Sequence, residues 1–126
     1  MAAILLIDDV AVVRTVLAKF LKRANHEVIE CGGGAEAWSA LSVRTFDIIV
    51  TDLWMKEGDG MEFIQKVRAR GHKTPIIAIT SGDLNSSAAA DGSSARRAGA
   101  DEVLLKPVTR TVLMDAITKL ISAPAR

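Results

Sequence analysis

The sequence has few aromatic residues, a single cysteine and no excess of charge of either sign. Only 4% of its 126 residues are aromatic and none is Tyr, so the core is expected to be aliphatic. One cysteine, Cys31, excludes an internal disulfide and is typical of a reducing intracellular compartment. The formal net charge of +1 gives no electrostatic reason to expect direct binding to nucleic acid.

The chain also lacks a long apolar run. The apolar stretch at residues 3–7 is short, follows no basic leader and ends in two carboxylates, unlike a signal peptide or a membrane span. We therefore expect a cytoplasmic protein that does not insert into membranes. The length fits one domain, and 49% hydrophobic with 25% charged residues is a globular balance.

What is present is an alternation of two kinds of segment. Short aliphatic runs rich in Ile and Val are typical of strands buried on both faces of a parallel sheet. They occur at residues 3–7, 27–31, 48–51, 76–80 and 102–105. Apolar residues at helical spacing occur at 13–24, 37–41, 63–67 and 113–121. The pattern predicts an α/β fold: a five-stranded parallel sheet, doubly wound as (βα)5, with helices on both faces.

The fourth helix has the weakest pattern. Gly92 and the small polar residues around it interrupt any helix between residues 85 and 100. We predict a long loop followed by a short helix at about 94–98. Thr109 could cap the last helix, and residues 123–126 are expected to form a C-terminal tail.

Polar residues stand at the carboxyl ends of four of the predicted strands. They are Asp8–Asp9, Thr51–Asp52, Thr80–Ser81 and Lys106–Pro107. In an open α/β sheet the functional crevice lies beyond the carboxyl ends of the strands. We therefore expect these side chains to meet on one rim of the sheet.

Three carboxylates that meet on one rim raise one another's pKa values and need cations beside them. Lys106 is one cation, and a hard divalent ion such as Mg²⁺ suits the oxygen ligands. A carboxylate can accept a phosphoryl group as an aspartyl-phosphate, through a transfer that depends on positioning and charge neutralisation. Asp8, Asp9, Thr80 and Lys106 supply these parts, with Asp52 as the acceptor.

Each residue also has a simpler explanation. Asp9 could be the N-cap of the first helix, Thr80 an ordinary strand-end residue and Lys106–Pro107 an ordinary loop. Taken alone, the cap is the better explanation for a single Asp. These explanations together require four features to fall on one rim by accident, so the sequence favours a phosphoryl-transfer site.

Six short motifs occur in an order and spacing that resemble the receiver domain of two-component response regulators, from Ile4 to about Ile121. They are Leu-Ile-Asp-Asp ending at 9, Ile-Val-Thr-Asp-Leu at 49–53, Gly-Asp-Gly at 58–60, Ile-Thr-Ser at 79–81, Ala-Gly-Ala-Asp at 98–101 and Leu-Lys-Pro-Val at 105–108. The resemblance implies a chemotaxis-regulator-like, flavodoxin-like sheet with strand order 2-1-3-4-5. It implies a receiver domain at 1–122, before the tail.

The resemblance also implies metal and acceptor roles. Asp52 is expected to be the phosphoacceptor and a metal ligand. Asp8 and Asp9 would hold Mg²⁺, directly or through water, with Mn²⁺ as an alternative ion. Trp54 would give its backbone carbonyl to the metal.

Three further residues are expected to bind the phosphoryl group. By resemblance, the Thr80 hydroxyl and the Ser81 backbone N–H would donate to phosphoryl oxygens, and Lys106 would be the essential lysine. The bond from Lys106 to Pro107 is expected to be cis, which proline makes accessible.

The resemblance implies a switch rather than an enzyme that turns over an external substrate. The domain would catalyse only its own phosphorylation and slow dephosphorylation. The donor would be a phosphohistidine on a sensor histidine kinase or a histidine phosphotransfer protein. The output would be binding to a protein target through the face of the fourth helix, fifth strand and fifth helix. The domain would be a monomer or a phosphorylation-dependent dimer.

Departures from the family pattern leave an alternative open. Val103 stands where many receivers carry a switch aromatic, Lys56 replaces a common proline, and Trp54 is bulky. A phosphorylation-independent docking module with a disused site therefore remains the second hypothesis. With 126 residues the chain is either a stand-alone receiver or one domain of a larger protein.

Overall fold

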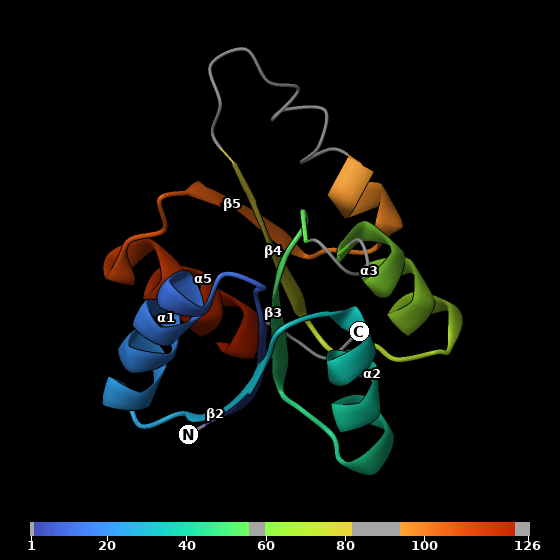
Figure 1. Cartoon of the computed structure of the whole chain (residues 1–126), viewed down its shortest axis with the longest axis horizontal. Helices are drawn as coiled ribbons and strands as arrows, with labels where there is room; N and C mark the ends of the chain where they lie inside the picture. The colour runs from blue at the N-terminus through green and yellow to red at the C-terminus, as the bar shows by residue number, and fades with distance from the viewer. Residues whose placement is uncertain (1, 56–59, 82–93, 123–126) are drawn as a thin grey trace.

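Five parallel strands form the centre of the protein, and helices cover both faces (Figure 1). The computed structural model describes residues 2–55, 60–81 and 94–122. The strands are β1 (Ala3–Ile7), β2 (Glu27–Cys31), β3 (Ile48–Asp52), β4 (Ile76–Ser81) and β5 (Glu102–Lys106). Their order in the sheet is β2-β1-β3-β4-β5 and every neighbouring pair is parallel, which confirms the predicted fold.

The helices lie in two layers. They are α1 (Ala11–Arg23), α2 (Gly34–Val43), α3 (Gly60–Ala69) and α5 (Arg110–Ser122), and residues 94–98 are also helical. Helices α1 and α5 cover one face of the sheet, and α2 and α3 cover the other (Figure 1). Among the helices of the described residues, none combines the length and the apolar character needed to span a bilayer.

Successive strand residues alternate between two aliphatic cores. Leu5 and Ile49 belong to the core under α2 and α3, whereas Ile4 and Val50 belong to the core under α1 and α5. This alternation follows from the two-residue repeat of a strand, and it explains why the central strands are apolar at nearly every position. The prediction of a mainly aliphatic core is confirmed, with Phe63 packed among aliphatic residues under α3.

The strand register brings the predicted site residues to one rim. Ile7, the residue before Asp8, pairs with Thr51, the residue before Asp52. Ser81 pairs with Lys106 on the adjacent strand. Three strands extend one residue beyond the predicted ends, because Asp52, Ser81 and Lys106 still take part in the ladder.

Two local predictions of helix structure are confirmed. The short helix at 94–98 is present, and the Thr109 hydroxyl accepts a hydrogen bond of 3.2 Å from the backbone N–H of Val112 at the start of α5. The predicted loop before the short helix falls on residues 85–93, and the predicted tail on 123–126. Both lie outside the described residues.

The simpler explanation of Asp9 as a helix cap is wrong. The N-cap residue of α1 is Val10, whose side chain makes no capping hydrogen bond. The backbone N–H of Val10 instead donates to Asp8 Oδ1 at 2.9 Å. The first carboxylate of the pair, Asp8, therefore accepts the hydrogen bond at the start of the helix.

Candidate functional site

Three acidic side chains meet beyond the ends of β1 and β3. One carboxylate oxygen from each of Asp8, Asp9 and Asp52 lies within 4.8 Å of the other two. Asp8 is 1% exposed and Asp52 is 4% exposed, whereas Asp9 is half-buried. The predicted convergence of the acidic residues is present in the structure.

Lys106 enters this acidic cluster from the end of β5. Its Nζ donates a hydrogen bond of 2.8 Å to Asp52 Oδ2 and lies 3.9 Å from Asp8 Oδ2. Burial lowers the pKa of Lys106, but the hydrogen bond and charge of Asp52, with the charges of Asp8 and Asp9, outweigh burial and raise it. Lys106 is therefore a permanent positive charge in the site at neutral pH.

Asp8 is held firmly, yet among the described residues one of its carboxylate oxygens has no hydrogen-bond partner. Its backbone N–H donates to the Cys31 carbonyl at 3.1 Å, and its Oδ1 accepts from Val10. Within the described residues, Oδ2 is buried without a hydrogen-bond partner. Burial raises the pKa of Asp8, the Val10 N–H lowers it, and the Asp52 charge raises it again, so that the pKa lies above its ordinary value.

These features fit a divalent cation. Buried polar atoms are nearly always hydrogen-bonded, so an unpartnered carboxylate oxygen indicates a missing ligand or ion. Among the described residues, two nearly buried carboxylates and a third beside them face one lysine, Lys106, and their oxygens are the ligands that Mg²⁺ prefers. Asp8, Asp9 and Asp52 are therefore suited to hold such an ion.

Thr80 brings a second unpartnered group to the same rim. Its side chain is fully buried, and among the residues described its Oγ1 has no hydrogen-bond partner. Thr80 lies one residue before the end of β4, where it pairs with Leu105 of β5. A hydroxyl in this position can donate to an incoming anion without breaking an existing bond.

The other predicted residues are placed less directly. Ser81 is the last residue of β4 and pairs with Lys106, so its backbone stands on the rim. Trp54 is 53% exposed, and its backbone N–H lies 3.4 Å from Asp52 Oδ1. The assigned roles of the Ser81 N–H and the Trp54 carbonyl stay predictions. The expected cis bond between Lys106 and Pro107 is confirmed.

Gly60 has a role that sequence reasoning missed. Its backbone N–H donates to the Leu53 carbonyl at 3.0 Å, which joins the start of α3 to the end of β3. A Cβ at this position would collide with the carbonyl oxygen of Asp52 and lie 2.9 Å from Leu53 Cα. Only glycine permits this close approach. The Gly-Asp-Gly motif at 58–60 was the available signal.

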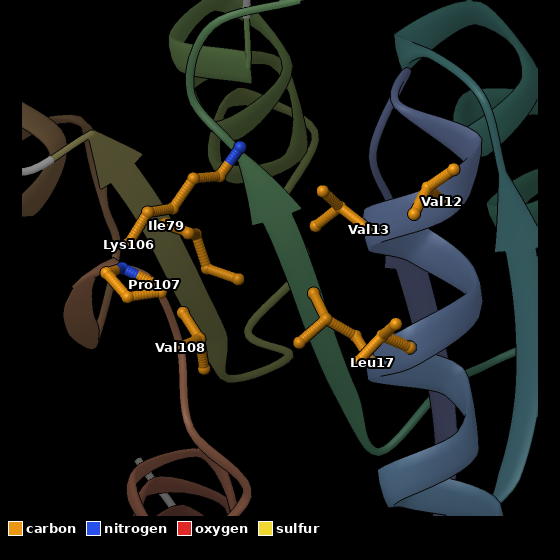
Figure 2. A pocket seen from close by; sticks show the side chains of 8 residues that line it. Val12, Val13, Leu17, Ile79, Lys106, Pro107 and Val108 are labelled. Atoms are coloured by element: carbon orange, nitrogen blue, oxygen red, sulfur yellow. The ribbon is translucent and has the colours of Figure 1, made fainter.

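An apolar groove adjoins the acidic cluster and was also missed. It has a volume of about 490 Å³ and is lined by Val12, Val13, Val16 and Leu17 of α1, Ile79 of β4, and Lys106, Pro107 and Val108. Figure 2 shows Val13 of α1 pointing toward the strands, with Lys106 reaching toward the end of β3. The groove therefore shares Lys106 with the cluster.

Val103 occupies the position where the resemblance to receiver domains implies a switch aromatic. It is half-buried and packs against the core under α2 and α3. Its neighbour Leu105, two residues along β5, is 55% exposed on the edge strand of the sheet. The described part of the fifth strand thus presents an apolar side chain outward, but no aromatic ring stands at the switch position.

Comparisons with known proteins agree with the geometry. Residues 4–118 match the model of the response regulator receiver domain. The chain is 32% identical over 118 residues to the chemotaxis protein CheY1 of Helicobacter pylori, covering 90% of this chain and 92% of that protein. It is 30% identical over 122 residues to a CheY homologue of Campylobacter jejuni, covering 94% and 91%. The structure of the chemotaxis response regulator CheY4 of Vibrio cholerae is similar, with TM-score 0.85, 26% identity and coverage of 95% and 98%.

Proposed function

This chain belongs to the response regulator receiver domain family of two-component systems, and from that premise we propose that it accepts a phosphoryl group on Asp52 and thereby switches its binding to a protein partner. The observation that carries the proposal is the position of the Asp52 carboxylate. It is almost buried, bonded to Lys106 at 2.8 Å and within 4.8 Å of oxygens from Asp8 and Asp9.

The proposed donor is a phosphohistidine of a sensor histidine kinase or a histidine phosphotransfer protein. A carboxylate oxygen of Asp52 attacks phosphorus, so that an O–P bond forms while the N–P bond to histidine breaks. The histidine nitrogen keeps the electron pair of that bond and takes up a proton. Lys106 stays beside the acceptor and offsets the charge on the phosphoryl oxygens.

The proposed metal ligands are Asp8, Asp9, Asp52 and the backbone carbonyl of Trp54. A bound Mg²⁺, or Mn²⁺ in its place, supplies positive charge that stabilises the transferring phosphoryl group. The protein contributes the fixed arrangement: Asp8 is anchored through its backbone and through Oδ1, and its Oδ2 remains available.

The proposed switch begins with the added charge. A phosphoryl group on a side chain carries nearly two negative charges at neutral pH. It would attract Lys106, the Thr80 hydroxyl and the Ser81 backbone N–H. Because Thr80 pairs with Leu105 and Ser81 with Lys106, a shift at β4 bears directly on the exposed edge of β5. We expect the target to bind the face formed by the helix at 94–98, β5 and α5.

The apolar groove beside Lys106 is the proposed docking surface for the donor protein. A donor histidine must approach Asp52 from outside, and the groove provides apolar contact area next to that approach. Val12 is 74% exposed on the α1 side of the groove, and Pro107 is exposed on the other. Burying such side chains against a partner is favourable.

The acceptor is tested by mass spectrometry after incubation with Mg²⁺ and acetyl phosphate. The wild-type protein should gain one phosphoryl group, and Asp52→Asn should gain none. Asp115→Asn, which changes an exposed carboxylate on α5, is the matched control and should be labelled as well as the wild type. Labelling of Asp52→Asn at the wild-type level would refute the assignment.

The donor surface is tested by a charge placed in the groove. Val12→Glu should slow transfer from a phosphohistidine partner, while labelling by acetyl phosphate stays unchanged. Val43→Glu places the same charge at an 82% exposed valine at the end of α2, on the other side of the sheet, and should affect neither reaction. Equal transfer to Val12→Glu and the wild type would exclude the groove as the donor surface.

The alternative function, a docking module with a disused site, makes the opposite prediction for Asp52→Asn. It expects an unchanged affinity for the target, whether or not acetyl phosphate is present. Val103 motivates this alternative because the aromatic coupling of the family cannot operate there. A phosphoryl-dependent gain in affinity that Asp52→Asn abolishes would reject it.

A further inference from the structure

Arg14 connects α1 to the carboxyl ends of β1 and β2, beside the acidic cluster. Its Nη1 donates a hydrogen bond of 2.8 Å to the backbone carbonyl of Asp8. Its Nε bonds Glu30 Oε1 of β2 at 3.3 Å, and the other oxygen of Glu30 lies 3.5 Å from Lys22 Nζ. Glu30 therefore holds the Arg14 guanidinium in place, and the guanidinium in turn holds the backbone carbonyl of Asp8.

The bond to the Asp8 carbonyl completes the anchoring of the acidic pair. The Asp8 N–H is fixed by Cys31, and Oδ1 is fixed by the Val10 N–H. The Asp8 carbonyl belongs to the peptide unit that joins Asp8 to Asp9. Because that unit is planar, its orientation sets the directions from which both carboxylates approach the rim.

We propose that Arg14 is a positioning residue for divalent-cation binding, acting through the peptide between Asp8 and Asp9, with Glu30 as its anchor. This inference rests on the proposed function, because it assumes that the acidic pair holds the ion. Arg14 does not touch the carboxylates in the described contacts; it fixes the backbone that carries them. Residues that orient metal ligands in this way typically change metal affinity when they are replaced.

The direction in which cation affinity changes when Arg14 is replaced distinguishes a positioning role from a purely electrostatic one. Arg14 carries a positive charge close to a cation site, so its removal by charge alone should tighten cation binding. Loss of the hydrogen bond to Asp8 should loosen cation binding instead. Lys19, exposed on the same helix, offers a substitution with the same change in charge and serves as the control.

The experiment is a Mg²⁺ titration of the wild-type protein, Arg14→Gln, Arg14→Lys and Lys19→Gln. Tryptophan fluorescence gives the signal, because the half-exposed Trp54 lies beside Asp52. We expect the dissociation constant of Arg14→Gln to rise about tenfold, at the lower end of the range for residues that orient metal ligands. Lys19→Gln should bind equally or slightly more tightly, and Arg14→Lys, which cannot form the same fork of bonds, should lie between.

A second readout separates binding from chemistry. At saturating Mg²⁺, labelling of Arg14→Gln by acetyl phosphate should return to within about twofold of the wild-type rate, since outer residues act on metal affinity. Arg14→Gln that binds Mg²⁺ as tightly as the wild type overturns this inference while leaving the proposed function intact. Failure of the wild-type protein to bind Mg²⁺ overturns the proposed function itself. Should Arg14→Gln not fold, the affinity of Arg14→Lys decides by the same criterion.

Discussion

The ion pairs Asp52–Lys106 and Asp101–Arg68 each contain a nearly buried carboxylate, and they differ in what surrounds them. Asp52 and Lys106 form one at the carboxyl rim, with an N–O distance of 2.8 Å. Asp101 and Arg68 form the other, where α3 meets the start of β4 and β5, with an N–O distance of 3.0 Å. In both pairs an aspartate that is nearly buried meets a partly exposed cation, so we compare the neighbours of each pair.

The second pair is built into the backbone. Arg68 donates to the Gly99 carbonyl at 2.9 and 3.0 Å and to the His72 carbonyl at 2.9 Å, and Asp101 accepts from the Ile76 N–H at 2.8 Å. These bonds join the end of α3, the start of β4 and the turn before β5. The pair at the carboxyl rim has no comparable network among the described residues. A charged pair tied to several backbone groups supports the fold, whereas Asp52–Lys106 stands beside two further carboxylates, Asp8 and Asp9, which suits it to chemistry.

The largest effect should come from breaking the structural pair. Arg68→Met should lower the free energy of unfolding by about 3–5 kcal/mol, because it leaves Asp101 buried without its cation. Urea unfolding followed by circular dichroism measures this loss. Arg97→Met, at an exposed position, should change stability by less than about 0.5 kcal/mol. At temperatures where Arg68→Met is folded, labelling of Asp52 should be unchanged.

The functional pair should respond in the opposite way. Lys106→Met should slow labelling by acetyl phosphate about 100-fold, the usual cost of removing one group that stabilises developing charge. Its loss of stability should be smaller than that of Arg68→Met, since Lys106 makes no backbone bond among the described contacts. Quenched-flow labelling and urea unfolding give the two numbers. A larger loss of stability for Lys106→Met than for Arg68→Met would contradict the assignment of Asp101–Arg68 as the structural pair.

Alanine substitutions at two glycines test the same difference between the functional and the structural ion pair. Gly60→Ala should destabilise the domain by about 1–3 kcal/mol, because the new methyl group meets the backbone of Asp52 and Leu53. It should also slow labelling, since Asp52 must shift. Gly99→Ala presses on the Arg68 side chain at a φ of +131°, so it should cost stability alone. Equal labelling rates for the two variants would contradict this division.

The smallest effect concerns pH. Burial, only partly offset by the Val10 N–H, raises the pKa of Asp8 above its ordinary value of 3.8. The resulting cost to stability is absent below that value and is fully present once the pH exceeds the folded pKa. Asp8→Asn should therefore stabilise the metal-free protein at pH 7 by about 1 kcal/mol, the usual size of a single substitution but with the opposite sign.

The control for this prediction is Asp115→Asn, at an exposed carboxylate with no such burial. Thermal unfolding in EDTA at pH 7 and at pH 3 measures both variants. The gain of Asp8→Asn should vanish at pH 3, where Asp8 is protonated in both states. A gain of equal size at both pH values would show that the charge of Asp8 is not its cause.

Much of this architecture could be predicted from the sequence because it depends on short-range patterns. Continuous runs of Ile and Val predicted the strands, and the predicted ends lie within one residue of the observed ends. Parallel strands then place their carboxyl ends on one rim, which is why Asp8, Asp52 and Lys106 could be brought together before any coordinates were known. The roles assigned to Ser81 and Trp54 depend on backbone atoms around a ligand, and they stay predictions.

The features that escaped prediction depend on side chains from distant segments. Arg14 lies outside the apolar stripe of α1, where arginine is usually solvated, yet it reaches back to the Asp8 carbonyl. The apolar groove requires α1 and the segment after β5 to face each other across the sheet, and no local pattern encodes that spacing. Asp9 was a reasonable helix cap by composition, but Asp8 takes the bond and Val10 is the cap residue.

Asp52, Ser81 and Lys106 are each the final residue of a hydrogen-bonded ladder. On its amino side each is joined to the sheet by backbone pairing with the neighbouring strand. An added phosphate on Asp52 therefore acts on residues that the ladder already couples, because Ser81 and Lys106 are paired across β4 and β5. Displacements after phosphorylation should therefore be correlated between the backbones of Ser81 and Lys106, which move as one pair or not at all.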